Sequence, residues 1–149
     1  MRRALLVSVQ MEYAEQIMGG AKTVELRRRK PAVEKGDYLI VYVPAPLRQV
    51  IGVVTVERVI AGAPAALWRR VRCRCYVSLG KYRKYFSGAA VGFGIVLVRP
   101  ARLELPITLE AIRSIQPNFS PQGYRYLTRP ALARAISQLK RRRASAPAP

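Results

Sequence analysis

The chain has 149 residues, the size of one domain, and folding is expected to bury about 68–70% of its unfolded surface. It carries 27 Lys and Arg against 8 Asp and Glu, and a formal net charge of +19 makes a polyanion, nucleic acid first, the expected partner. The absence of histidine excludes mechanisms that depend on an imidazole, and two cysteines alone cannot complete a four-ligand zinc site.

The N-terminal half alternates short apolar runs with turn residues. Residues 5–9 form an apolar strand, and residues 11–18 show the three- and four-residue spacing of a helix with Tyr13 and Ile17 on its inner face. A strand at 22–28 follows, then a tight turn at 34–37. Two more strands are expected at 38–43 and 50–60, where Gly52 marks a bulge or a close backbone approach.

The middle of the chain is dense in arginine. Residues 61–71 contain a short helix that is expected to end at Trp68. If residues 70–76 are extended, Arg70, Arg72 and Arg74 line one face, and Ser78 then caps a helix in which tyrosines alternate with basic residues. Cations beside aromatic rings suit nucleic acid, because the cations meet phosphates while the rings stack on bases. The alternative is that the rings pack in the core and the arginines are solvated.

The C-terminal third is expected to begin with a glycine-rich strand over residues 88–103. A turn or helix at 107–115, a loop at 116–126 and a last helix at 130–139 complete a single domain over residues 1–139. Residues 140–149 form a basic, Ala- and Pro-rich tail without regular structure. The longest apolar run, residues 91–98, is shorter than the about 20 residues that cross a bilayer, so we expect a cytoplasmic protein without a membrane partner.

The stretch 19–29 concentrates the polar chemistry of the chain. The paired glycines are expected to end the preceding helix, and alternation then turns Thr23, Glu25 and Arg27 away from the core. Lys22 and Arg28 add positive charge around the single carboxylate. This cluster is the candidate site, and the alternative is an edge strand with a solvated, charged face, since exposed ion pairs are common and worth about 0–1 kcal/mol.

Five strands with short helices inserted between them, without a βαβ rhythm, predict an α+β fold built on a small mixed β-barrel. Residues 20–27 resemble the G-x-K-T-x-E-x-R signature of the ASCH domain family, a branch of the PUA-like superfamily. The resemblance extends over residues 4–127, through 36–37, 42–46, 52, 68, 85–88, 105–107 and 121–127. It implies a PUA-like β-barrel with a basic cleft beside the first helix that binds RNA or another nucleic acid.

Some proteins of this family resemble small acetylcytidine amidohydrolases, in which a lysine acts with a threonine three residues later. Lys22 matches that lysine, but Glu25 stands where the threonine would be. This departure leaves two functions open. Glu25 could act as a general base on water beside Lys22 in a hydrolase that uses no metal ion, with RNA or a modified nucleoside as substrate.

The other function, which we favour from the sequence, is binding without catalysis. It uses no cofactor and no metal ion, the partner is RNA rather than DNA, and the oligomeric state is left open. Lys22, at the mouth of the basic cleft, would contact phosphate, and Glu25 would read a base edge or orient Lys22 and Arg27. The expected nucleic-acid-binding residues are Lys22, Thr23, Glu25, Arg27, Arg28, Arg70, Arg72, Arg74, Gln122 and Tyr124.

Overall fold

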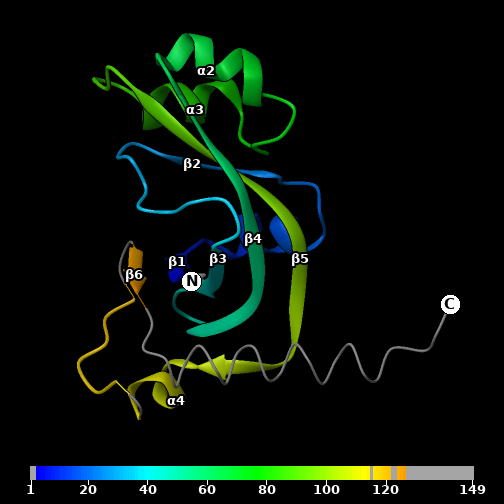
Figure 1. Ribbon diagram of the computed structural model, residues 1–149, viewed down its shortest axis with the longest axis vertical. Coiled ribbons are helices and arrows are strands. Elements are labelled where there is room, and N and C mark those ends of the chain that lie inside the picture. Colours follow the sequence, from blue (N-terminus) through cyan, green and yellow to red (C-terminus); the bar gives the residue numbers. More distant parts are fainter. Residues whose placement is uncertain (1–2, 115, 122–123, 127–149) are drawn as a thin grey trace, which may run out of the picture.

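The computed structural model describes residues 3–114, 116–121 and 124–126, and all structural statements below concern these residues. They form one curled sheet flanked by short helices, which confirms the predicted α+β class (Figure 1). The strands are β1 (Ala4–Ser8), β2 (Val24–Arg27), β3 (Tyr38–Val43), β4 (Gln49–Gly62), β5 (Gly92–Thr108) and β6 (Tyr124–Tyr126). The helices are α1 (Met11–Met18), α2 (Pro64–Val71), α3 (Leu79–Tyr85) and α4 (Leu109–Arg113).

The sheet of the described residues has the strand order β2-β5-β4-β3-β1-β6. β1 and β3 are parallel, and the other neighbouring strands are antiparallel. β2, which carries the candidate cluster, is therefore an edge strand paired only with β5. One side of its backbone is open to solvent or to another part of the chain.

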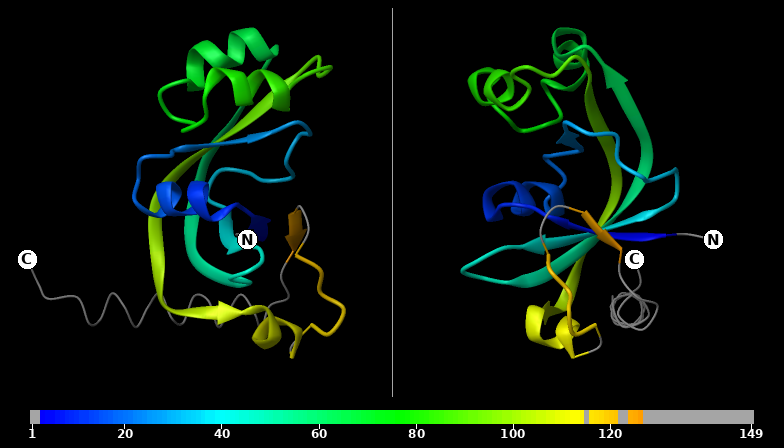
Figure 2. Two further views of the ribbon diagram at one scale, coloured as in Figure 1. Left: turned by 180° about the vertical axis from the view of Figure 1, so that it is seen from behind. Right: turned by 90° about the vertical axis from the view of Figure 1, so that its left-hand side faces the viewer.

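The longest strands, β4 and β5, form a bent ribbon that runs the length of the molecule (Figures 1 and 2). Their pairing runs from Gln49–Thr108 at one end to Gly62–Gly92 at the other, with three register shifts, and such bulges increase bending. One shift lies at Gly52, where an added Cβ would clash with the Met18 sulfur. The predicted close approach at Gly52 is confirmed. The ribbon connects α4 at one end of the molecule to α2 and α3 at the other.

The core consists of three apolar clusters along this ribbon. The first lies under α1, the second beside α4 and the third under α2 and α3. In β2, Val24 and Leu26 are buried while Glu25 and Arg27 are half-buried on the opposite side, as the alternation predicted. The predicted α1 and its ending are also confirmed, because Ala14 and Ile17 are buried and Gly20 has a φ of +85°.

Two predictions for the middle of the chain are corrected. Helix α2 continues past Trp68 to Val71, so Arg70 is helical, and residues 72–75 make a turn instead of an extended run. The backbone N–H groups of Arg74 and Cys75 both donate to the Val71 carbonyl, which coils this segment. The three arginines therefore do not share one strand face. The cap of α3 is as predicted, with the Ser78 Oγ accepting from the backbone of the third helical residue.

The described C-terminal part also differs from expectation. β5 begins at Gly92 rather than at residue 88 and extends to Thr108, through positions where a turn or helix was expected, and α4 is only five residues long. β5 is this long because β4 pairs with it over both halves. Residues 124–126 pair with β1 as strand β6, where the sequence predicted a loop. The predicted last helix and the tail lie outside the described residues.

Candidate functional site

The candidate cluster on β2 is a compact, largely buried group of charges. The Lys22 amino group donates to the Cys75 carbonyl at 2.5 Å and lies 3.6 Å from Glu25 Oε2. The Arg27 guanidinium contacts the other Glu25 oxygen at 3.0 Å. The side chains of Lys22, Glu25 and Arg27 are only 3%, 12% and 18% exposed. The three charges that the sequence singled out therefore meet in space, and they pair mainly with one another.

Burial decides what Lys22 can do. Desolvation lowers the pKa of Lys22 below its usual range, and the Glu25 carboxylate opposes this shift. The amino group also lies 5.3 Å from the centre of the Tyr13 ring. Lys22 is closed in by a carbonyl, a carboxylate and a ring, so it is buried and does not lie exposed at the mouth of a cleft. Its contacts join β2 to the turn after α2.

Thr23 and Arg28, on either side of the cluster, also connect the β2 segment to the part of the chain that contains α2 and α3. The Thr23 hydroxyl accepts from Arg74 Nε at 3.2 Å, and the Arg74 carbonyl accepts from the backbone of Thr23. Arg28 Nη1 donates to the carbonyls of Tyr85 and Ser87 at 2.6 and 2.9 Å. Thr23 and Arg74 are thus half-buried and mutually bound, whereas the side chain of Arg28 is exposed at the end of α3.

The remaining predicted contacts lie apart from this cluster. Arg70 and Arg72 are exposed on α2 and at its C-terminal end. Tyr124 lies in β6, on the opposite edge of the sheet from β2, and Gln122 is outside the described residues. The structure therefore brings together Lys22, Thr23, Glu25, Arg27 and Arg74, and it leaves Arg70, Arg72 and Tyr124 elsewhere.

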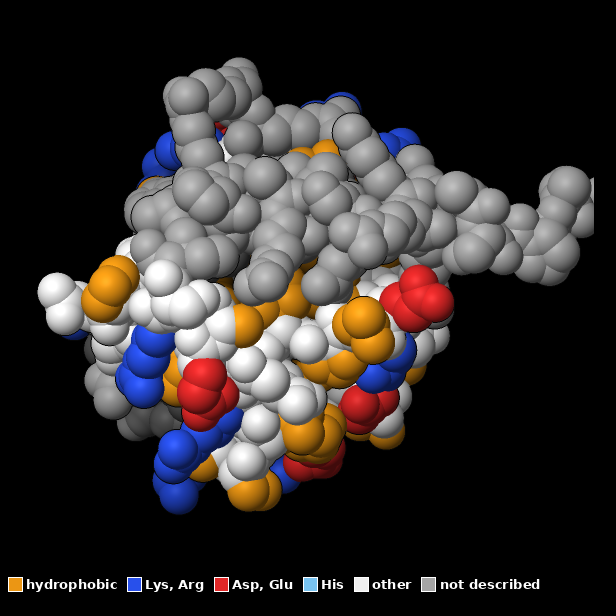
Figure 3. All heavy atoms as spheres, turned by 90° about the horizontal axis from the view of Figure 1, so that it is seen from below, with side chains coloured by type: hydrophobic (Ala, Val, Ile, Leu, Met, Phe, Trp, Pro, Cys, Tyr) orange, Lys and Arg blue, Asp and Glu red, His pale blue; other side chains and the backbone are white. Residues whose placement is uncertain are grey.

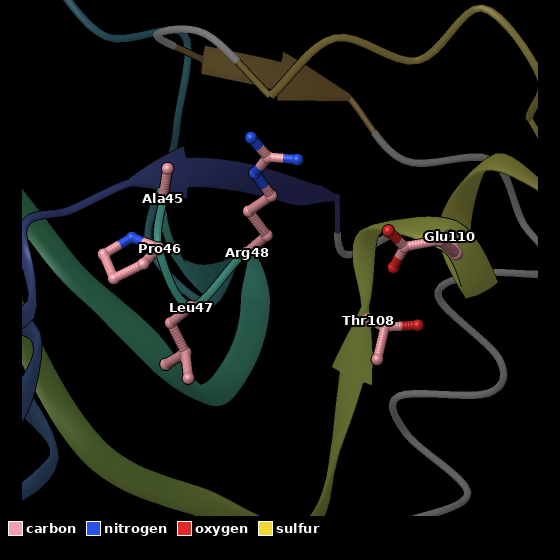
Figure 4. Close-up of a pocket in the computed structure, with 6 residues that line it drawn as sticks. All are labelled: Ala45, Pro46, Leu47, Arg48, Thr108 and Glu110. Atoms are coloured by element: carbon pink, nitrogen blue, oxygen red, sulfur yellow. The ribbon is translucent and has the colours of Figure 1, made fainter.

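An open pocket of about 730 Å³ lies at the other end of the β4–β5 ribbon (Figure 4). Its walls are the turn between β3 and β4, which contributes Ala45 to Arg48, and the junction of β5 with α4, which contributes Thr108 and Glu110. The pairing of Gln49 with Thr108 and the hydrogen bond from Leu109 N to the Arg48 carbonyl, at 3.1 Å, hold the two walls together. The pocket is wide and open to solvent, so it could accept part of a long ligand but would not enclose a small molecule.

Arg48 is held in an uncommon backbone conformation at this pocket. Its φ is +50°, in the left-handed region, which costs a non-glycine residue of order 1 kcal/mol or more. The side chain is exposed, and within the described residues neither Arg48 nor Glu110 forms an ion pair. The pocket therefore presents one cation and one carboxylate that are both available to a ligand.

Tyr42 lies next to this pair of charges. Its side chain is 2% exposed, and burial raises its pKa, while the positive charges of Arg48 and Arg113 act in the opposite direction. At neutral pH the hydroxyl is therefore protonated and can donate a hydrogen bond. Tyr42 is not one of the residues that line the pocket, and its ring packs in the core cluster beside α4.

The sequence reasoning did not assign a role to these residues. Residues 42–46 were part of the family resemblance, but Arg48 and Glu110 are 62 positions apart and carry no local motif. Their meeting depends on the pairing of β4 with the far end of β5. Residues 3–114, 116–121 and 124–126 contain no group of three His, Cys, Asp or Glu that could hold a metal ion, and no helix long and apolar enough to cross a membrane.

Comparison with known proteins identifies the family. The ASCH domain model matches residues 7–106. A Zymomonas mobilis protein named ASCH domain-containing ribonuclease is 34% identical over 122 residues, which cover 80% of this chain and 80% of that protein. The crystal structure of ASCH from Zymomonas mobilis has a TM-score of 0.86 at 30% identity and covers 92% of this chain and 96% of that chain.

A more distant likeness concerns the fold alone. The N-terminal domain of Staphylothermus marinus McrB has a TM-score of 0.59 at 15% identity, over 92% of this chain and 94% of that chain. The family match covers well over half of the chain, and the sequence and the structure agree on the same relative. This chain therefore belongs to the ASCH domain family.

Proposed function

We propose that this domain binds RNA and cleaves it in the pocket between Arg48 and Glu110. The observation that carries the proposal is the meeting of an exposed guanidinium and an exposed carboxylate in the wall of one open pocket. The similarity to a protein named as a ribonuclease and the net charge of +19 both support RNA as the ligand.

The chemistry of RNA cleavage assigns a role to each group. A guanidinium can bind two oxygens of one phosphate, so Arg48 would hold the scissile phosphate and neutralise its developing charge. Glu110 would accept the proton of the ribose 2′-hydroxyl as its oxygen attacks phosphorus. The bond to the 5′-oxygen then breaks, and that oxygen takes a proton from solvent. The products are a 2′,3′-cyclic phosphate and a 5′-hydroxyl.

The test compares the same substitution at two glutamates. Glu110→Gln and Arg48→Ala should abolish cleavage of a single-stranded RNA, whereas Glu25→Gln should retain cleavage in the fraction that is folded. The assay follows a labelled RNA on a gel and identifies the ends of the products. A substrate with a 2′-deoxy sugar at the cleaved position should be inert, because it lacks the attacking group.

Two results would contradict this assignment. Loss of cleavage in folded Glu25→Gln with normal cleavage in Glu110→Gln would place the reaction at the β2 cluster instead. A wild-type protein that binds RNA but leaves it intact would favour the second candidate function, binding alone. The excess of 27 basic over 8 acidic residues supports that candidate on its own, since phosphate contacts need positive charge but no catalytic group.

A further inference from the structure

We propose that α2, α3 and their connecting turn form a second RNA-binding surface, distant from the pocket, for the backbone of a single strand. This surface, residues 63–91, is called the basic cap below. The inference rests on the proposed function and extends it, because the substrate becomes a strand that touches both ends of the molecule and not one nucleotide in a pocket.

The basic cap has positive charge only. No acidic residue occurs between Glu57 and Glu104. Six exposed basic side chains lie on the cap: Arg69, Arg70, Arg72, Lys81, Arg83 and Lys84. The face around α4, at the pocket end, is different, because acidic and basic side chains are interspersed there with apolar ones (Figure 3). The cap is therefore a segment whose own side chains offer a polyanion cations and no acids, and the neighbouring Glu25 is half-buried and paired with Lys22 and Arg27.

These cations are not needed to hold the cap together. The apolar sides of α2 and α3 are buried in one cluster that includes Leu67, Val71 and Tyr82. None of the six exposed cations forms an ion pair with a residue of the described chain. Basic residues at the C-terminal end of a helix interact favourably with its dipole, but this does not account for Lys81, which lies in the first turn of α3. Unpaired like charges repel one another, and an anionic partner relieves that repulsion.

Two exposed tyrosines indicate that the strand is single. Tyr76, in the turn between the helices, is 48% exposed, and Tyr85, at the end of α3, is 39% exposed. The Tyr85 ring is supported by Phe86 in an edge-on contact, with centroids 4.8 Å apart. Aromatic rings beside cations bind single strands by stacking on unpaired bases, which a double helix does not offer. Leu79 and Val91 are also exposed on the cap, so a lipid surface is the competing partner that the vesicle experiment below tests.

The cap and the pocket lie at opposite ends of the β4–β5 ribbon (Figure 1). β4 has 14 residues, so at about 3.3 Å per residue the two sites are separated by at most about 45 Å along it. Single-stranded sites in other proteins span about 4–16 nucleotides. A single RNA strand of about 16 nucleotides can therefore reach from the cap to the pocket.

The test compares two triple variants that remove the same charge. One is Arg70→Gln/Arg83→Gln/Lys84→Gln on the cap. The other, Lys35→Gln/Arg58→Gln/Arg99→Gln, removes exposed charges outside it. The probe is a 16-nucleotide single-stranded RNA with 2′-O-methyl sugars, which lacks the attacking hydroxyl, so binding is measured without cleavage.

Removal of three phosphate contacts should lower the slope of log affinity against log salt by about 2, at about 0.7 per contact. Between 50 and 200 mM salt, the cap triple should then lose about 20-fold less affinity than the wild type. The control triple should keep the wild-type slope. Equal slopes for both triples would overturn the proposal, as would equally tight binding of a duplex RNA with the same dependence on the cap.

A second variant tests the stacking step without changing charge. Tyr76→Ala should weaken binding of the 16-nucleotide probe by about fivefold or more while leaving the salt slope unchanged. A cap triple that loses binding to anionic phospholipid vesicles but not to RNA would identify a lipid surface and overturn the proposal. If only the proposed function is wrong, the wild-type protein will leave natural RNA intact, but the cap triple will still have a lower salt slope than the control triple.

Discussion

Replacing Lys22 with alanine tests whether the β2 cluster is part of the folded core. The substitution removes a donor to the Cys75 carbonyl at 2.5 Å and the partner of Glu25 at 3.6 Å. Because the side chain is 3% exposed, no solvent replaces either contact. We therefore expect a large loss of stability, in contrast to the small loss that an exposed phosphate-binding lysine would give.

The magnitude follows from the geometry. Removing one partner of a buried ion pair typically costs about 3–5 kcal/mol. Glu25 is 12% exposed and keeps Arg27 at 3.0 Å, so the lower end applies, and we expect the free energy of unfolding to fall by about 3 kcal/mol. For a chain of this size that corresponds to about 6–12 °C in Tm.

The assay is urea and thermal unfolding of the wild type, Lys22→Ala and two controls. Lys30→Ala removes an exposed lysine that follows the same strand, and its Tm should stay within about 2 °C of the wild type. Lys22→Met keeps the aliphatic volume and removes only the charged end, so it should be more stable than Lys22→Ala. A Tm for Lys22→Ala as close to the wild type as that of Lys30→Ala would refute the buried role.

The pH dependence gives a second check on Lys22. Burial lowers its pKa in the folded state below the ordinary value of 10.5, so between these two values the unfolded chain binds the proton more tightly. The wild type should therefore gain stability relative to Lys22→Met as the pH rises through this window toward 10.5. A difference between the two proteins that does not change with pH would show that Lys22 is solvated.

Three further predictions concern α3, the ribbon and the tail. Tyr82 donates to the Pro64 carbonyl at 2.7 Å, and burial raises its pKa from 10.0 to about 12, so its contribution is complete below pH 10 and is lost between pH 10 and 12. Urea unfolding should show Tyr82→Phe to be less stable than the wild type by about 1 kcal/mol at pH 8. Above pH 10 the stability of Tyr82→Phe should fall less steeply with pH than that of the wild type, and an equally steep fall would contradict this. Gly52→Ala places a Cβ 2.9 Å from the Ala101 carbonyl oxygen, so it should lower the free energy of unfolding by about 1–3 kcal/mol, and an unchanged Tm would show that the ribbon can relax. Deleting residues 140–149 should remove two to four phosphate contacts, and each loss should lower the slope of log RNA affinity against log salt by about 0.7. An unchanged slope would mean that the tail makes no phosphate contact.

The sequence alone was sufficient for the elements whose signals lie in neighbouring residues. The helix over Met11–Met18, its ending at Gly20, the alternation of β2 and the Ser78 cap each depend on spacings of a few positions, and all four are confirmed. The resemblance to the ASCH domain family is likewise carried by short motifs. It correctly predicted the fold class, because a family fold is conserved together with its order of strands and turns.

The local signals failed where a distant pairing overrides them. The alternating arginines from Arg70 suggested an extended run, but Leu67 and Val71 bury one side of α2 and continue the helix to Val71, where a turn over residues 72–75 follows. At the end of β5, pairing with β4 continues the strand to Thr108, past the turn expected there. In both cases tertiary contacts outweigh intrinsic preferences that differ by less than about 1 kcal/mol per residue.

The chemical character of each charge was decided by tertiary structure alone. The sequence identified Lys22, Glu25 and Arg27 as a group but not that they are closed off from solvent, since burial depends on the turn at Cys75, 53 positions away. It contained no sign of the pocket, because Arg48 and Glu110 meet only when β4 pairs with the far end of β5. Charge and periodicity are properties of the chain, whereas solvation and proximity, which determine whether a charge binds a ligand or stabilises the core, arise only when distant segments pack together.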